Sequence, residues 1–596
     1  MTATIEDVAN QRFDYIVVGG GTAGLVVAAR LSEDPNVSVL VLEAGQANLN
    51  DPVLLHPDSH GNHFGNDQYS WNYVTTEQEF SAGVRWSWHR GKGLGGSSGI
   101  NFLQWTKPPA EEVNEIEKLG NPGWNWDTIQ RQFRKIEGFI PPTKDVQEQF
   151  HLNFDDYGVG TEGPLNVAFP GTINPVNLIL RETYLNAGVP LARKPYNGDP
   201  KGYYLVLQTY DPRTRTRTYS PTAYYLPHKD RTNLTVLTSA LVSRILTKKM
   251  SDGQLSSRGV EFLHGDKTYS AATRKEVILT AGTLQSAHLL ELSGIGNKEV
   301  LRKINVPLLK ELPGVGQNVQ EHAVLVTSWE LKENVDLENL NILNKPIISS
   351  QEFYAKETGV YTGGRSVVFT SLQNISPKAA DIIEKAQKAI TKKMETASPS
   401  LREQYNIQLD RLERGAPAAE FIASVMFVPG PNPPASGKQQ IRLVCAANHF
   451  FSRGTIHSVS NDPKVDPEFD PHYFEEEVDL DMLVEQVKWA RHLAEHVSPL
   501  KDIIVKAVNP GPEVQTDDEI RESIKKAGMT TWHTVGSCSM LPEDKEGVVD
   551  PSLKVYGTTN IRVADLSIIP LNFAAHSQAM VYAIAERAAE IIKTQS

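Results

Sequence analysis

Two histidines near the end of the chain have surroundings that suit acid–base chemistry. His533 follows Trp532 and precedes a run of small residues, and His576 lies in a second small-residue segment. Imidazole titrates near neutral pH, so a histidine can accept the proton of an alcohol as a general base. Each histidine alone fits a structural, hydrogen-bonded role better. As a pair, they indicate a site built around a reacting hydroxyl group.

Other readings of these histidines have less support. No acid-rich spacing accompanies them, which argues against a zinc site. Cys538 is near His533 in sequence, so a Cys–His nucleophile is an alternative, but nothing else in the sequence favours it. With Cys445 it makes up the only two cysteines of the chain, too few for a disulfide framework or a thiolate metal cluster.

A glycine-rich loop near the start predicts a dinucleotide site. An apolar strand at 14–18 leads into Gly19-x-Gly21-x-x-Gly24 and then a helix, and a second apolar strand at 37–42 ends in Glu43. In this pattern the glycines permit a tight turn, close approach of a pyrophosphate and close helix–strand packing. The helix N-terminus attracts phosphate, and the terminal acid accepts hydrogen bonds from a ribose. We therefore expect Thr22 and Ala23, inside the loop, to face the cofactor.

A second glycine-rich stretch covers residues 91–101. Glycines at this density are costly inside helices and strands, but they let backbone pass close to a large flat ligand. A flexible loop is an equally good interpretation of this stretch alone. Its candidate ligand-binding residues are Lys92, Gly95, Gly96, Ser97 and Asn101.

Length and composition describe an ordinary globular protein of several domains. The 596 residues exceed one compact core and predict about two to four domain-sized units. The net charge of −12 argues against nucleic-acid and anionic-membrane surfaces, and no apolar run is long enough for a membrane span. The polar first residues contain no apolar signal core, so we expect a cytoplasmic protein, or a secreted one if a native signal is missing.

Three later stretches predict how the chain is organised. A strand at 275–280 followed by a helix through residue 290 indicates a late return to the nucleotide-binding sheet, and residues 561–565 form a buried strand ending in Asp565. The charged, alanine-rich residues 377–413 predict two helices at the surface. These helices would be a lid, an oligomer contact or, with slightly better support, simply solvated helices.

Four motifs in order make the chain resemble the glucose–methanol–choline (GMC) oxidoreductases over nearly its whole length. The first is Gly19–Gly24 with Glu43, the second is 91–101, and the third is 282–296, in which Ala287 replaces the usual Pro or Ser. The fourth combines Trp532-His533 with Ala575-His576. The resemblance implies an α/β (α+β overall) architecture, with a Rossmann-like FAD-binding domain and a discontinuous substrate-binding domain on a mixed or antiparallel sheet.

The predicted domains follow the family pattern. The FAD-binding domain would comprise 10–160, 228–325 and 525–596. The substrate-binding domain would comprise 161–227 and 326–524, with 377–413 as a helical surface insertion.

The resemblance also implies roles for single residues. His533 would take the hydroxyl proton, His576 would hydrogen-bond the substrate oxygen, and Trp532 would line the substrate pocket. Family members that bind flavin covalently often use a histidine near the position of Asn101. Asparagine cannot form that bond, so the resemblance implies noncovalent FAD. The implied cofactor-binding residues are Gly19, Gly21, Thr22, Ala23, Gly24, Glu43, Lys92, Gly95, Gly96, Ser97, Asn101, Val242, Asp565 and Gln578.

The leading functional prediction is oxidation of a primary alcohol, aromatic or furanic, to an aldehyde. Hydride would pass to flavin N5, and O2 would reoxidise the flavin to give H2O2. One alternative is a glucose or other sugar dehydrogenase that uses quinone acceptors, and another is a flavin-containing hydroxynitrile lyase. A small alcohol is the expected partner, with no nucleic acid or membrane; the oligomeric state is left open.

Overall fold

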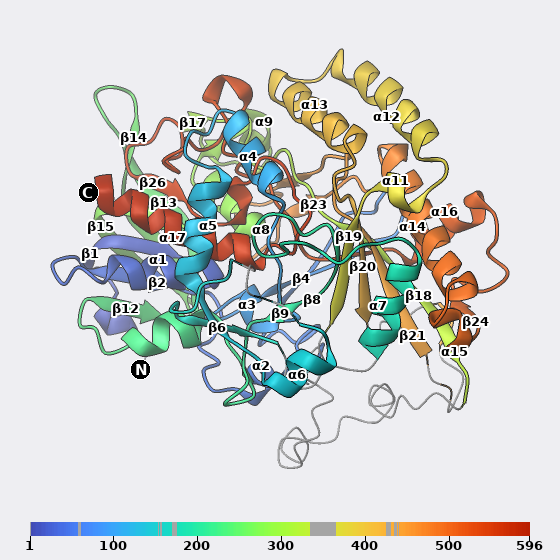
Figure 1. Cartoon of the computed structure of the whole chain (residues 1–596). Helices are drawn as coiled ribbons and strands as arrows, with labels where there is room; N and C mark the ends of the chain where they lie inside the picture. The colour runs from blue at the N-terminus through green and yellow to red at the C-terminus, as the bar shows by residue number, and fades with distance from the viewer. Residues whose placement is uncertain are drawn as a thin grey trace.

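Two large β-sheets organise the chain (Figure 1). The computed structural model describes residues 2–57, 61–152, 154, 158–169, 176–333, 365–424, 431–433, 438 and 440–595. Within these ranges no helix is both long and apolar enough to cross a membrane. The architecture is a mixed α/β fold in which strands distant in sequence pair side by side.

The first sheet grows from the N-terminal strand–helix–strand unit. The sequence alternates there between short apolar strands and a small-residue helix, and the parallel strands are buried on both faces. The predicted return of residues 275–280 to this sheet is confirmed, because β15 pairs with β1 in parallel. The strands are β12 (Leu234–Leu237), β2 (Val39–Leu42), β1 (Arg12–Val18), β15 (Lys267–Leu279), β14 (Leu255–His264), β13 (Ala240–Lys249) and β26 (Ile561–Val563).

Helix α1 (Thr22–Leu31) packs on this sheet, and two further helices pack outward from it. Helix α1 joins β1 to β2 and packs against α17 (Gln578–Gln595), which in turn packs against α5 (Trp126–Ile136). Figure 1 shows the first and last elements of the chain side by side here. The end of the chain therefore completes the domain that its beginning starts.

The second sheet is antiparallel and carries the other half of the site. Its strands are β24 (Ile504–Asn509), β18 (Ala323–Leu331), β21 (Gln440–Ala447), β20 (Ala419–Ser424), β19 (Ser366–Thr370) and β8 (Gly202–Leu205), with β25 (Met529–Thr530) beside β18. Helix α14 (Glu477–His496) packs on β21 and β18. The domain limits stay a prediction; β18 and β25 begin inside stretches that we assigned to the FAD-binding domain.

Residues 377–413 contain two helices, α12 (Ala379–Met394) and α13 (Pro399–Glu413), at the outer edge of the molecule (Figure 1). Each buries one face, with Ile382, Ala386 and Ile390 from α12 and Tyr405 and Leu409 from α13. Their charged faces remain in solvent, which is the pattern of amphipathic surface helices.

The remaining elements are shorter and connect or cover the sheets. They are α2 (Pro52–Leu55), β3 (Ser70–Val74), β4 (Ser87–Gly91), α3 (Ser97–Ile100), β5 (Gln104–Trp105), α4 (Ala110–Lys118), β6 (Glu137–Ile140), α6 (Lys144–Gln149), β7 (Leu165–Ala168), α7 (Val176–Asn186), β9 (Leu207–Gln208), β10 (Tyr210–Asp211), β11 (Thr216–Arg217), α8 (Gly282–Leu292), β16 (Ile295–Gly296), α9 (Lys298–Lys303), β17 (Lys310–Glu311), α11 (Leu372–Ile375), β22 (Thr455–His457), β23 (Glu468–Asp470), α15 (Leu500–Ile503) and α16 (Asp517–Ala527).

Candidate active site

The N-terminal glycines have separate physical roles. Gly19 has a φ of +101°, and a Cβ there would lie 2.7 Å from the carbonyl oxygen of Thr280. A Cβ on Gly24 would lie 1.9 Å from the carbonyl oxygen of Gly19, so only glycine lets α1 approach the end of β1 this closely. A Cβ on Gly21 would meet nothing closer than 3.8 Å. Gly21 is thus the position where the loop stays open for a ligand.

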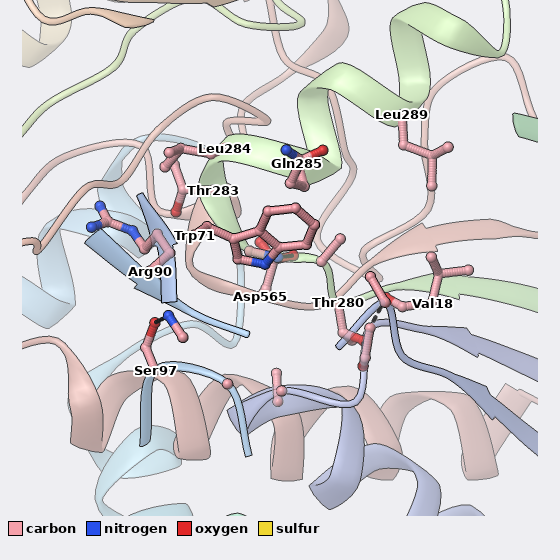
Figure 2. Close-up of a pocket in the computed structure, with 18 of the residues that line it drawn as sticks. Val18, Trp71, Arg90, Ser97, Thr280, Thr283, Leu284, Gln285, Leu289 and Asp565 are labelled. Carbon is pink, nitrogen blue, oxygen red and sulfur yellow. Dashed lines mark hydrogen bonds between the residues drawn. The ribbon is translucent and has the colours of Figure 1, made fainter. Parts of the chain in front are cut away.

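This loop borders a cavity at the carboxyl ends of the parallel strands, where open α/β sheets bind their ligands. The cavity has a volume of about 200 Å³. Figure 2 shows the Trp71 ring across it, with Asp565 behind and Thr283, Leu284 and Gln285 contributed by α8. The predicted cofactor residues that line it are Gly19, Gly21, Thr22, Ala23, Glu43, Gly96, Ser97, Val242 and Asp565.

Two buried carboxylates hold the loops around this cofactor cavity. Glu43 accepts hydrogen bonds from the backbone N–H groups of Gly20, Gly45 and Gly93 at 2.8, 2.8 and 3.0 Å. A carboxylate has about four acceptor positions, so Glu43 retains one for a ribose hydroxyl. Burial raises the pKa of Glu43, and its three N–H donors oppose that shift.

Asp565 is the second of these carboxylates and holds the chain at the other side of the cofactor cavity. It accepts from the N–H of Gly282 at 2.9 Å, from the hydroxyl of Ser286 at 2.6 Å, and from the N–H and hydroxyl of Ser567. Burial raises its pKa as well. The carboxylate ties β26 to the start of α8, two elements that are distant in sequence.

The other predicted cofactor residues lie around rather than in this cavity. Lys92 Nζ is 4.4 Å from the centre of the Trp71 ring, a cation–π contact, and neither Gly24 nor Gly95 lines the cofactor cavity. The side-chain amide of Asn101 donates to Gln578 Oε1, and both residues line a second cavity. Contacts of these five residues with FAD stay a prediction.

The second cavity adjoins the first and has a volume of about 230 Å³. Thr22, Ser97, Trp532, Ser577 and Val581 line both. Its floor is one face of the second sheet, where Val326 pairs with Val444 and Val444 pairs with Ile422. The aromatic rings of Phe64, Phe102 and Trp532 border it, with centroids 5.1 to 6.1 Å apart.

His533 and His576 both line this second cavity, with ring centroids 5.0 Å apart. His533 Nδ1 lies 3.1 Å from Nδ1 of His322 and 2.9 Å from the hydroxyl of Thr531. Within the described ranges no residue hydrogen-bonds its Nε2. Burial, reinforced by His576, His322 and Arg90, holds the pKa of His533 well below its ordinary value. At neutral pH the ring is therefore uncharged and able to accept a proton.

A buried carboxylate orients His576. Nε2 of His576 is 2.7 Å from Oε1 of Glu420 on β20, and its backbone N–H donates to the hydroxyl of Thr106 at 2.7 Å. Glu420 is 1% exposed. Sequence reasoning missed this residue, although an acid inside the apolar strand 419–424 was an available signal.

A second carboxylate, Glu321, fixes the backbone of the other histidine. It accepts from the N–H of His533 at 2.6 Å and from that of His322 at 2.9 Å, and its carboxylate is 3.6 Å from Arg90. Burial raises the pKa of Glu321 and lowers that of Arg90. Neither Glu321 nor His322 was recognised from the sequence, because both act through contacts with residues more than 200 positions away.

The alternatives to this chemistry find no geometric support. Cys538 is fully buried and does not line the cavity, and burial raises the pKa of its thiol. In the portion of the chain that the structure describes, no group of three His, Cys, Asp or Glu side chains is arranged to hold a metal ion.

The comparisons with known proteins agree with this geometry. Models of the GMC oxidoreductase family match residues 13–324 and 451–585. The GMC oxidoreductase family protein Mala s 12 of Malassezia sympodialis is 33% identical over 98% of this chain and 93% of its own length.

Solved structures show the same fold. An FAD-dependent oxidoreductase from Chaetomium thermophilum is 27% identical, with a TM-score of 0.88 over 98% of this chain and 99% of its own. A fungal aryl-alcohol oxidase is 25% identical, with a TM-score of 0.82 over the same shares.

FAD fits the first cavity on structural grounds. The open position at Gly21, the start of α1 and the remaining acceptor of Glu43 match a pyrophosphate and its ribose. The second cavity, which shares five lining residues with the first, would then receive the reacting end of the flavin together with the substrate. This chain belongs to the GMC oxidoreductase family and is an FAD-dependent oxidoreductase that acts on alcohol-type substrates.

Proposed function

We propose that the protein oxidises a primary alcohol, aromatic or furanic, to its aldehyde, with O2 as the electron acceptor and H2O2 as the second product. The observation that carries this proposal is an uncharged, half-buried His533 beside His576 in a cavity bordered by aromatic rings. Flat rings pack well against such walls. The similarity to an aryl-alcohol oxidase supports the same substrate class.

The two histidines have separate roles in the proposed reaction. His533 takes the hydroxyl proton at Nε2, because its Nδ1 faces His322 and Thr531. His576 hydrogen-bonds the substrate oxygen through Nδ1, because its Nε2 faces Glu420. Bound FAD supplies the acceptor for the hydride that leaves the alcohol carbon. His576 is buried and His533 is half-buried, which limits the access of water to the reacting atoms.

An anaerobic experiment tests the proposal against its alternatives. The purified holoenzyme is mixed separately with benzyl alcohol, 5-hydroxymethylfurfural, glucose and mandelonitrile, while the absorbance of oxidised flavin is followed. We expect loss of that absorbance with the two aromatic alcohols. Bleaching by glucose alone would support a sugar dehydrogenase, and cyanide release without bleaching would support a lyase; either result contradicts the proposal.

The electron acceptor needs its own measurement. In air, we expect one H2O2 for each aldehyde formed from benzyl alcohol. Turnover that requires an added quinone and produces no peroxide would refute O2 as the acceptor. It would leave the alcohol chemistry unchanged.

A further inference from the structure

An arginine that has no hydrogen-bond or ion-pair partner among the described residues lines the substrate cavity. Arg365 directly precedes β19 and is 8% exposed. Within the described part of the chain, no residue forms a hydrogen bond or ion pair with its guanidinium; the nearest specific contact is the ring of Phe102, 5.5 Å from Cζ. Burial lowers the pKa of Arg365 to about 10, so the group stays charged at neutral pH.

Three other buried arginines of the described residues have protein partners. Arg411 forms an ion pair with Glu115, and Arg562 forms one with Glu276. Arg217 donates to the carbonyl oxygens of Leu54, Ser98 and Asn101. A buried charge without a counter-charge or hydrogen bonds is costly, and proteins retain one where a ligand completes it. Arg365 therefore has the environment of a ligand-binding residue, unlike these three.

The register of the second sheet places Arg365 relative to the histidines. Phe369 of β19 pairs with Glu420, the carboxylate that binds His576, and Val367 pairs with Ile422 of the cavity floor. The ladder continues to Arg365, whose carbonyl accepts the N–H of Val206. Positions 365, 367 and 369 share one face, because side chains alternate along a strand. Arg365 is thus about 13 Å along the strand from Phe369, the residue that pairs with Glu420.

The cavity is consequently polarised along the sheet. One end holds the two histidines and Glu420, where an alcohol would react, and the other end holds a positive charge. Between them lie the apolar side chains Val326, Ile422 and Val444. An aryl alcohol with a negative group on the side opposite its hydroxymethyl group has the matching pattern.

We propose that Arg365 binds a carboxylate of the substrate, so that the preferred substrates are aromatic alcohols carrying a carboxylate. This inference rests on the proposed alcohol oxidation and names its substrate class. The planar guanidinium matches a carboxylate through two parallel N–H donors, and Phe102 holds its plane on one side.

The test compares a charged substrate with a neutral one of similar shape. The kcat/KM of the holoenzyme is measured for 4-(hydroxymethyl)benzoate and for 4-methylbenzyl alcohol, in wild type and R365M. We expect wild type to prefer the carboxylate and R365M to lose roughly 10- to 100-fold on it, with little change for the neutral alcohol. Equal losses on both substrates, or no preference in wild type, would overturn the proposal.

A matched control separates a specific contact from general charge. Arg442 lies two strands away on the same sheet, about 10 Å across it, and does not line the cavity. R442M removes the same charge and should retain the preference for the carboxylate. If R442M lost the preference as fully as R365M, the diffuse field and not Arg365 would be responsible.

A binding measurement works even if no alcohol is oxidised. Calorimetric titration of the oxidised holoenzyme with 4-methylbenzoate should show binding that weakens roughly 10- to 100-fold in R365M. Such binding without any alcohol turnover would refute the proposed function and leave the carboxylate site standing. Equal affinity in both proteins would overturn the site.

A conservative variant covers the case in which R365M does not retain FAD. R365K keeps the charge but loses the two-pronged donor geometry. It should hold FAD and bind 4-methylbenzoate more weakly than wild type. Wild-type affinity in R365K would contradict the proposed two-donor contact.

Discussion

The two adjoining cavities are built by different means. Backbone forms much of the cofactor cavity: Gly19 and Gly21 shape its floor, and the carboxylates of Glu43 and Asp565 are satisfied by backbone N–H and serine hydroxyl donors. Side chains form the substrate cavity, and some of their polar atoms lack partners within the described ranges. Examples are the guanidinium of Arg365 and Oε1 of Gln104.

Because of this difference, the first cavity binds the cofactor and the second determines which substrates are accepted. The carboxylates of the cofactor cavity are held in place by protein donors before any ligand binds, so this cavity is preorganised for its cofactor whatever the substrate. A cavity with unsatisfied groups discriminates, because only a ligand that completes them avoids leaving buried polar atoms unpaired. The comparison predicts that variants in the two cavities will fail in separable ways.

The largest expected effect belongs to the substrate cavity. H533A removes the residue assigned as general base, so we expect kcat to fall roughly 10²- to 10⁴-fold. FAD content should stay at the wild-type level, because His533 lines only the second cavity. Anaerobic stopped-flow reduction of the flavin by benzyl alcohol, with the flavin-to-protein ratio, measures both quantities. A near-normal reduction rate would disprove the assigned role.

A variant of the cofactor cavity should lose FAD binding and keep its catalytic residues intact. Gly96 has a φ of +49°, and a Cβ there would lie 2.9 Å from Cα of Gly21, so G96A pushes the two glycine loops apart. Strain of about 1–3 kcal/mol should weaken FAD binding by roughly 5- to 150-fold. Saturating FAD should restore turnover. Flavin retention after gel filtration, and fluorescence titration of the stripped protein, provide the measurement.

The neighbouring glycine is a matched control for G96A. A Cβ on Gly99 would lie 3.6 Å from the Tyr219 ring, an ordinary contact, and its backbone is helical. G99A should therefore retain FAD as wild type does. If both variants lost flavin equally, loop composition in general, rather than the contact with Gly21, would explain the loss.

The same division explains what the sequence could predict. The cofactor cavity comes from contiguous motifs, so the loop 19–24 with Glu43 and the sheet return at 275–280 were readable locally. The paired histidines were recognised from their small-residue surroundings, and the family resemblance then gave each of them a role. Glu420 reaches His576, and Arg365 reaches the substrate cavity, only through cross-strand register in the second sheet. Such pairings between distant strands leave no short motif, which is why both were missed.

A smaller effect should follow from removing the charge behind His576. E420Q keeps the shape of the side chain that lies 2.7 Å from Nε2 but replaces its carboxylate by a neutral amide. We expect kcat/KM for benzyl alcohol to fall about tenfold, the value of one charge-assisted hydrogen bond. FAD content should not change. An unchanged kcat/KM together with an unchanged pH profile would show that Glu420 is structural only.

The smallest expected effect is on the free energy of unfolding. It shows whether an unpartnered polar group near the substrate cavity lowers stability. His322 is buried, and within the described residues its Nε2 has no hydrogen-bond partner. Burial, with His449 and His576 nearby, lowers its pKa from 6.5 to about 3. Between these values the unfolded chain binds a proton that the folded protein does not, so this histidine makes stability fall as pH falls below 6.5.

H322Q removes that proton uptake. The free energy of unfolding should therefore decline less steeply below pH 6.5 in the variant, by up to about 1.4 kcal/mol per pH unit. Urea unfolding of the holoenzyme at a series of pH values from neutral down to mildly acidic measures the slope. H492Q, at an exposed position of α14, is the matched control. If H322Q and wild type had the same slope, His322 would already be charged or solvated in the folded protein. The substrate cavity would then contain more water than the low pKa of His533 requires.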